Sequence, residues 1–424
     1  MIRRDVAAGY AKLLCGEAVA KLSVLVAFAY LARVLGPSGL GQIELALSWT
    51  VVFVLTAESS LGSYGARVLA VEPLAAGRLV PQIMVLRALF VAPVFALLVL
   101  ASRWMPAGDL MVLFGCVMLA VPFANQWVLQ ASGRMHAVAL ATALRYVVFA
   151  ALVFAWVRPG SDLRLVAVAE IAGAAVFSIA VAGLVRASTR VRFEWAGAWR
   201  GAWQLIASTW FFAASTLLWA CSWYAPTLLV GLRLTPRDTA SIAAPLRIVL
   251  TVHTAVFLYF FNLLPRIASE LSLGPERWRA LVHDSLRLSM WAACFVAVTT
   301  TVMSPLIVRV LFGAGYEGAV APLAIAIWMI PIAQFSGHFR FSLIAAGQQR
   351  LEARASAIGA ATVVGLTLPL AAMAGPAGAA VAFVLGGLAN AWSAWAAARK
   401  HIGMVAPMRQ VPLAAVLNGR GADA

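Results

Sequence analysis

Charged residues are scarce in this chain, and their scarcity excludes most classes of soluble protein. Asp, Glu, Lys and Arg make up 11% of the 424 residues, while 63% of the residues are hydrophobic. A soluble globular domain carries roughly 25% charged residues. The longest polar breaks are too short to hold a folded soluble domain. We therefore expect a protein that lies almost entirely within a membrane.

The residue patterns of metal, disulfide and nucleotide sites are also missing. The cysteines are scattered, each inside an apolar run, at Cys15, Cys116, Cys221 and Cys294. Their spacing indicates neither a metal site nor a disulfide framework. The aspartates lie far apart and no phosphate-binding glycine loop occurs, which argues against ATP hydrolysis. We expect no cofactor and no enzyme activity, with a membrane-bound polymerase, ligase or glycosyltransferase as an alternative.

What the chain does contain is a succession of long apolar stretches. A membrane helix needs about 20 predominantly apolar residues. Twelve stretches of suitable length fill the sequence, at residues 13–34, 40–60, 79–101, 110–131, 136–157, 163–186, 204–231, 239–264, 285–312, 320–346, 352–374 and 376–398. We therefore predict an all-α polytopic membrane protein with twelve transmembrane helices.

The net charge of +16 indicates an orientation in the membrane rather than a nucleic-acid partner. If both termini lie on one side, most of the 32 Lys and Arg residues fall on that side. The opposite side holds Arg33, Arg103, Arg158, Arg164, Arg233, Arg237 and Arg309. Basic loops face the cytoplasm in membrane proteins. We expect both termini in the cytoplasm and no binding of nucleic acid.

The two halves of the chain share an order of short motifs. Leu35-Gly36-Pro37 aligns with Leu234-Thr235-Pro236, and Arg67 aligns with Arg266. Because each half has six predicted spans, the halves run in the same direction and form parallel repeats around a central cavity, which is typical of transporters. We predict a six-helix bundle at residues 1–186, an interfacial linker at 187–203, a second bundle at 204–400 and a cytoplasmic tail at 401–424.

The linker carries three tryptophans at helical spacing, at Trp195, Trp199 and Trp203. Arg190, Arg192 and Arg200 lie nearby. Tryptophan and arginine together favour the membrane–water interface. We expect a short interfacial helix, or a simple aromatic and basic anchor, on the cytoplasmic leaflet.

An ordered series of motifs resembles a known family. The series runs through Ala32–Gly41 (ARVLGPSGLG), Glu58–Arg67 (ESSLGSYGAR), Gln126-Trp127, Gly133-Arg134, Leu264-Pro265-Arg266, Leu311–Tyr316 (LFGAGY), Gly347 with Arg350, and Gly375–Gly378. It is similar to the polysaccharide-type (Wzx-like) flippases of the multidrug/oligosaccharidyl-lipid/polysaccharide (MOP) superfamily. No single motif is specific, but the set covers essentially the whole chain in order.

The resemblance implies a flippase in the bacterial inner membrane. Its substrate would be an undecaprenyl-diphosphate-linked oligosaccharide for exopolysaccharide or O-antigen synthesis, and its fold would be MATE/MurJ-like. The expected partners are this lipid-linked substrate, the bilayer and a polysaccharide polymerase or export machinery, with the protein itself a monomer. A MATE-like antiporter of drugs or cations, and a flippase for the peptidoglycan precursor, remain the alternatives.

Charged residues inside the predicted spans are the candidate site residues, because such charges are costly at membrane depth. The basic ones are Lys21, Arg87, Arg145, Arg247 and Arg340. An arginine stays charged and holds phosphate oxygens with its planar fork. We therefore predict that these five side chains contact the diphosphate and glycan of the substrate, with Arg145 and Arg247 the strongest candidates.

Four further residues are candidate charge partners or coupling groups for H⁺ or Na⁺, namely Glu17, Glu44, Glu170 and His253. Glu17 and Lys21 have the spacing and order of a helix ion pair. Arg87 and Arg340 lie near span ends, where a long side chain can reach the interface instead of a substrate. For His253, an ordinary polar contact is the more common role.

Overall fold

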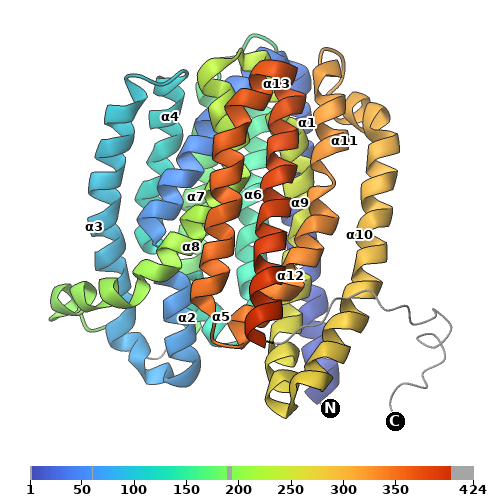
Figure 1. Cartoon of the computed structure of the whole chain (residues 1–424). Helices are drawn as coiled ribbons and strands as arrows, with labels where there is room; N and C mark the ends of the chain where they lie inside the picture. The colour runs from blue at the N-terminus through green and yellow to red at the C-terminus, as the bar shows by residue number, and fades with distance from the viewer. Residues whose placement is uncertain (1, 60, 189–192, 403–424) are drawn as a thin grey trace.

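In the computed structural model, residues 2–59, 61–188 and 193–402 are described, and all assigned elements within them are helices (Figure 1). The α-helices are α1 (Ile2–Glu58), α2 (Leu61–Val71), α3 (Ala76–Ser102), α4 (Gly108–Gly115), α5 (Gln126–Ala131), α6 (Met135–Trp156), α7 (Arg164–Ser188), α8 (Ala198–Arg233), α9 (Pro236–Leu273), α10 (Pro275–Leu311), α11 (Val320–Ala326), α12 (Met329–Ala345) and α13 (Gln349–Ile402). Short 3-10 helices are η1 (Pro73–Ala75), η2 (Cys116–Phe123) and η3 (Glu317–Ala319). The predicted tail at 401–424 lies almost wholly outside the described residues.

The long helix α1 folds back on itself at Gly36. This residue has φ 68° and ψ 178°, a conformation that glycine adopts readily, and Pro37 follows it. Arg247 contacts both Phe28, before the bend, and Glu44, after it. In a straight helix these two residues would lie about 24 Å apart, because each residue adds 1.5 Å. The bend thus separates the predicted spans 13–34 and 40–60.

The helix α13 has a similar bend at Gly375, which has φ 58° and precedes Pro376. Figure 1 shows its two limbs side by side, joined at the upper end. This bend separates the predicted spans 352–374 and 376–398. We call the end of the molecule that holds both bends the bend end. The opposite end, where α1 begins and α13 ends, is the termini end (Figure 1).

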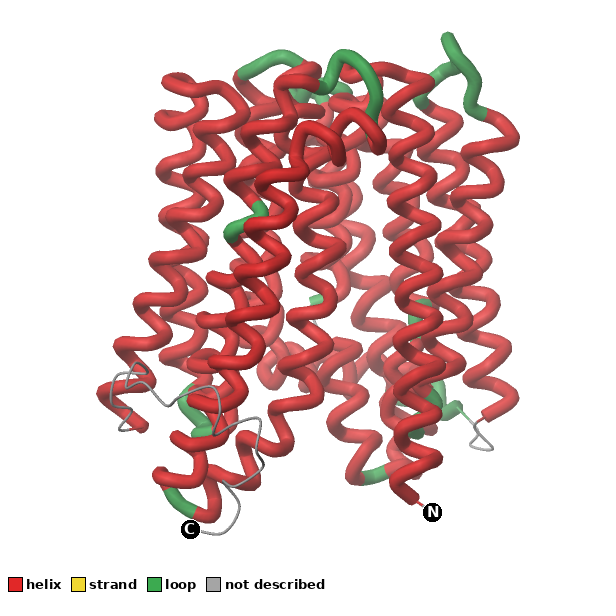
Figure 2. The backbone as a smooth tube through the Cα atoms, turned by 90° about the vertical axis from the view of Figure 1, so that its right-hand side faces the viewer, coloured by secondary structure: helices red, strands yellow, loops and turns green. Residues whose placement is uncertain are grey.

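The fold is that of a multi-pass membrane protein. Among the described residues, eight helices are long and apolar enough to cross a membrane, and these include the folded segments Val19–Glu58 and Gln349–Ile402. Figure 2 shows the helices running roughly side by side, with most loops at the two ends. The count of eight helices does not establish twelve crossings, so that number stays a prediction.

The predicted continuous span 110–131 is wrong in detail. The structure divides it into α4, η2 and α5, with a non-helical break at Ala124 and Asn125. Pro122 lies just before the break and cannot donate a backbone hydrogen bond. Apolar composition alone hides this interruption, because the residues of η2 are as hydrophobic as those of a regular span.

The two halves of the chain share a buried core. The largest cluster of buried apolar residues contains Phe28, Ile43 and Phe149 from the first half and Val249 and Tyr316 from the second. Alanine is frequent in this cluster. Small residues let helix backbones approach closely within a membrane. The halves are therefore packed against each other along α1 and α9.

The beginning of α8 extends sideways from the bundle, at the lower left in Figure 1. Trp195, Trp199 and Trp203 are all about half exposed. Trp199 and Trp203 form an edge-to-face pair with 5.7 Å between their ring centroids. The predicted helix starts only at Ala198, so Trp195 precedes it. The exposed tryptophans fit the interfacial position that the sequence predicts, and contact with lipid remains a prediction.

Candidate functional site: a charged cavity between the halves

A cavity of about 250 Å³ lies between the two halves of the chain. Its walls come from both limbs of α1, from α4, α6 and α7 in the first half, and from α8 and α9 in the second. Five of the predicted site residues line it together: Lys21, Glu44, Arg145, Glu170 and Arg247. The fold thus brings together residues that lie up to 226 positions apart in the sequence.

Arg247 and Glu44 form a two-pronged ion pair across the cavity wall. The Nε and Nη2 atoms of Arg247 donate to Oε1 and Oε2 of Glu44, both at 2.7 Å. The ring of Phe28 lies 3.4 Å from the guanidinium carbon. The Glu44 side chain is 6% exposed and that of Arg247 is 21% exposed. The planar fork of Arg247 is therefore held in one orientation by a carboxylate and by an aromatic face.

Arg145 forms the second ion pair, with Glu170 on the neighbouring helix α7. The Nη2 atom of Arg145 donates to Oε1 of Glu170 at 2.5 Å. The rings of Tyr146 and Phe177 lie 5.3 and 6.0 Å from the guanidinium carbon. Its Nε atom is buried and has no hydrogen-bond acceptor among the described residues. Arg145 thus keeps a donor that its protein surroundings leave unused.

The described lining of the cavity is rich in charged and polar groups. The basic residues are Lys21, Arg145 and Arg247, and the acidic ones are Glu44 and Glu170. Hydroxyl groups of Ser48, Tyr224, Thr227 and Thr251 line the same walls. A cavity with two arginine forks, an unused Nε donor and several hydroxyls can hold an anion that carries several oxygens.

A second cavity, of about 330 Å³, adjoins the first. The two share Leu47, Val51, Arg145, Tyr146 and Glu170 as lining residues. The second cavity continues through the first half of the chain to Glu58 and Gln126. The Arg145–Glu170 pair therefore stands at the junction of two polar spaces inside the apolar bundle.

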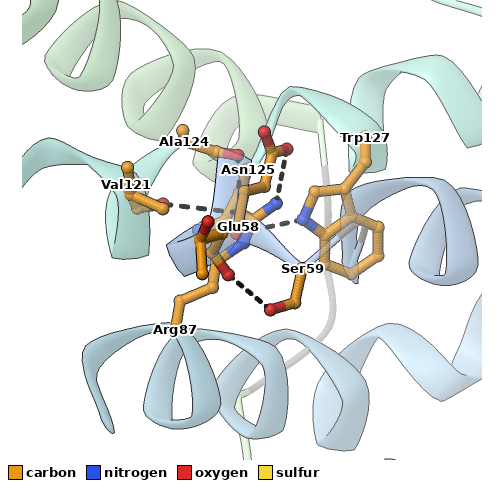
Figure 3. Close-up of polar contacts among 8 residues, drawn as sticks. Glu58, Ser59, Arg87, Val121, Ala124, Asn125 and Trp127 are labelled. Atoms are coloured by element: carbon orange, nitrogen blue, oxygen red, sulfur yellow. Dashed lines mark hydrogen bonds and ion pairs between the residues drawn. The ribbon is translucent and has the colours of Figure 1, made fainter. Parts of the chain in front are cut away.

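Arg87 lies in neither cavity. Its side chain is completely buried, and Nη2 donates to Oε1 of Glu58 at 3.1 Å (Figure 3). Nη1 donates to the carbonyl oxygens of Ala124, at 2.9 Å, and Val121, at 3.5 Å. The Ala124 carbonyl lies in the break after η2, and the Val121 carbonyl lies in the last turn of η2, where it also accepts from the Ala124 N–H. Arg87 thus stabilises the end of a broken helix, and the structure does not bring it to the predicted site.

Arg340 also lies away from both cavities. It pairs with Glu352, near the start of α13, and the Nε–Oε1 distance is 2.8 Å. Ser356 donates a further hydrogen bond to the same carboxylate at 3.0 Å. Glu352 is the first residue of a predicted span, and its pairing with Arg340 was not predicted from the sequence. His253 lines neither cavity, and its ring packs on Trp223, which lines the first cavity, with 4.4 Å between the ring centroids.

One predicted residue is not tested, and several residues of the cavity were not predicted. The side chain of Glu17 lies outside the described residues, so the predicted Glu17–Lys21 pair stays a prediction. The aromatic residues Phe28, Tyr146, Trp223 and Tyr224 line the cavity but were not predicted. Of these, Tyr146 follows Arg145 directly, and a tyrosine beside a buried charge could have drawn notice.

Comparisons with known proteins match most of the chain. The family model described as "Polysaccharide biosynthesis protein" matches residues 6–270, more than half of the chain. No match was found among curated proteins.

Solved structures show the fold. An inward-facing multidrug resistance MATE family transporter of the MOP superfamily has a TM-score of 0.77 at 12% identity, with 91% of this chain and 94% of that chain covered. The lipid II flippase MurJ, in an inward closed conformation, has a TM-score of 0.72 at 12% identity, with 91% and 87% covered. A MOP superfamily transporter from Pyrococcus furiosus has a TM-score of 0.66 at 13% identity, with 92% and 94% covered. The chain thus has the fold of MOP-superfamily transporters.

Proposed function

This chain belongs to the polysaccharide biosynthesis protein family, and we propose that it is a flippase for undecaprenyl-diphosphate-linked oligosaccharides. The proposed location is the bacterial inner membrane, with both termini in the cytoplasm. The family and the transporter fold support membrane transport rather than catalysis. The proposed substrate goes beyond them and depends on the cavity.

The observation that carries the proposal is the presence of two arginine forks in the cavity between the halves. Arg145 and Arg247 both line this cavity, and the buried Nε donor of Arg145 has no acceptor among the described residues. A diphosphate cannot enter hydrocarbon without a large loss of solvation. Arginine forks replace water around its oxygens with charge-assisted hydrogen bonds. The cavity would therefore lower the barrier for the head group, while the polyprenyl tail stays in the lipid.

Movement of the head group requires that the cavity open to one side of the membrane at a time. The halves are joined at the bend end, where Tyr316 donates to the Ala32 carbonyl at 3.1 Å and Arg33 donates to the Val310 carbonyl. In the proposed orientation the bend end faces away from the cytoplasm. The structure would then correspond to a state closed on the far side, from which rocking of the halves releases the substrate.

A cation exporter is the competing function within this fold. It would be favoured by a cavity whose carboxylates lack basic partners, whereas Glu44 and Glu170 are each paired with an arginine here. For the Pyrococcus furiosus transporter, a "reverse polarity of binding pocket" is said to suggest a different function. That statement concerns the other protein, but it supports treating cavity polarity as the property that separates functions in this fold.

The proposal is tested with the purified full chain in proteoliposomes. We expect a fluorescently tagged undecaprenyl-diphosphate oligosaccharide to move between leaflets faster than in protein-free vesicles, as measured by protection from a membrane-impermeant quencher. Cationic-dye efflux from the same vesicles should stay at the protein-free level. Dye efflux without lipid movement, across several glycans, would favour the exporter, and movement of lipid II alone would favour a peptidoglycan-precursor flippase.

A further inference from the structure

The Glu44–Arg247 pair has a place in the fold that the other cavity pair lacks. Glu44 lies on the second limb of α1, and Arg247 lies on α9, so the pair joins the two halves of the chain. Arg145 and Glu170 lie on α6 and α7, within the first half. Breaking the first pair removes a connection between the halves, whereas breaking the second does not.

The pair also lies beside the zone where the halves are most tightly joined. One turn before Glu44, Gly41 approaches α9 so closely that a Cβ atom would meet the carbonyl oxygen of Pro236 at 1.8 Å. Beyond it, toward the bend end, Tyr316 bonds to Ala32. The ion pair therefore stands where this contact zone meets the cavity, and a ligand in the cavity reaches it directly.

Glu44 accepts two hydrogen bonds from Arg247, as a phosphate group would. Its two oxygens accept from Nε and Nη2, which are the donors of a bidentate arginine–phosphate contact. The ring of Phe28 covers one face of the guanidinium and Glu44 holds its Nε–Nη2 edge, so an anion that takes this edge must displace the carboxylate. A phosphate group and Glu44 cannot both hold this edge with two hydrogen bonds each.

We propose that Glu44 is a specificity-determining competitor for the anionic head group at Arg247, and that a diphosphate displaces it and so releases the join between α1 and α9. This inference rests on the proposed function. A displaced Glu44 would be a buried carboxylate without its partner, which is unfavourable. Separation of α1 from α9 would relieve this by admitting water. A ligand with less charge than a diphosphate competes less well with the carboxylate and leaves the join intact.

The experiment measures binding and opening in the full chain in nanodiscs. The probes are geranylgeranyl diphosphate and geranylgeranyl monophosphate, which share one tail and differ in head-group charge. Binding is followed by calorimetry. Opening is followed by the distance between spin labels at Trp104→Cys and Met373→Cys. These are exposed positions in different halves, the first between α3 and α4 and the second two residues before the bend at Gly375. The four native cysteines are replaced by alanine in this background.

In the otherwise unmutated chain, the diphosphate should lengthen the label distance, and the monophosphate should bind at least about tenfold more weakly and leave the distance unchanged. Glu44→Gln removes the competing charge while keeping the shape. This variant should bind the diphosphate about tenfold more tightly, and the difference in affinity between the diphosphate and the monophosphate should become smaller. Its spin labels should be as far apart without ligand as they are in the unmutated chain with diphosphate bound. A merely structural role of Glu44 would not change the ratio between the probes.

The matched control is Glu170→Gln, which alters the pair inside one half. Its label distance without ligand should equal that of the unmutated chain. If Glu44→Gln does not yield folded protein, Glu44→Asp is measured in its place. Its affinity ratio and its label distance should change in the same direction by a smaller amount.

An unchanged probe ratio and an unchanged distance in a folded Glu44 variant, while the diphosphate still binds, would overturn this inference and leave the proposed function standing. Absence of diphosphate binding to the unmutated chain would overturn both.

Discussion

Replacing Arg247 by alanine should reduce translocation of the diphosphate-linked lipid by about 100-fold, because a bidentate charge-assisted contact contributes up to about 3 kcal/mol. The variant also leaves the carboxylate of Glu44 in the cavity, where it repels the head group. Arg247→Lys keeps the charge but lacks the planar fork, and we expect an intermediate loss of about tenfold. Rates are measured in proteoliposomes with equal amounts of inserted protein.

The control for this prediction is Arg233→Ala. Arg233 ends α8, is exposed, and lies outside both cavities. Its replacement should leave the translocation rate unchanged. Arg145→Ala is measured in parallel and should also lose activity, because Arg145 stands at the junction of the cavities. A rate for Arg247→Ala equal to that of the unmutated chain would remove Arg247 from the site.

Replacing Arg87 by methionine should damage the fold rather than the chemistry of transport. The variant leaves Glu58 without its ion-pair partner and removes donors from the carbonyls of Val121 and Ala124. Loss of one member of a fully buried ion pair costs about 3–5 kcal/mol, and the cost here is smaller because the Glu58 side chain is 31% exposed. We expect a clear fall in the thermal denaturation temperature and in the yield of monodisperse protein, measured in detergent by tryptophan fluorescence and gel filtration.

Two further variants separate this explanation from a general sensitivity to arginine loss. Arg78→Met removes an exposed arginine whose contact to Glu72 is 3.5 Å, and it should change stability by less than about 1 kcal/mol. The double variant Glu58→Gln/Arg87→Met should recover part of the loss, because it no longer contains the unpaired carboxylate. An Arg87→Met protein as stable as the unmutated chain would show that the contacts in Figure 3 contribute little.

The helical architecture was predictable because apolar runs and their breaks follow directly from the cost of polar backbone in lipid. The predicted spans 13–34 and 40–60 leave a break at residues 35–39, and the structure places the bend of α1 there. The break at Ala124 and Asn125 was missed, because the apolar residues on both sides outweigh the two polar residues Asn125 and Gln126 in hydropathy. The hydropathy of a segment indicates whether the segment lies in lipid or in water, but it does not indicate whether the segment forms one continuous helix.

The candidate site was predictable in its residue types and only partly in its membership. Arg145, Arg247, Glu44 and Glu170 stood out because charges inside apolar runs are rare, and the fold does bring them to one cavity. Arg87 was a weaker candidate because it lies near a span end, and in the structure it lies against the unpredicted break and is fully buried. The pairing of Glu44 with Arg247 spans 203 positions, and no local pattern encodes a contact of that separation.

The measurement that tests the central claim most directly compares two lipids in vesicles that contain the unmutated chain. Both carry the same oligosaccharide and the same polyprenyl tail, and they differ only in a diphosphate or an uncharged linker. A cavity whose basic side chains select the head group should move the diphosphate lipid and leave the uncharged lipid at the protein-free rate. Equal movement of both lipids, or movement of the uncharged one alone, would contradict the proposal that Arg145, Arg247 and Lys21 select an anion.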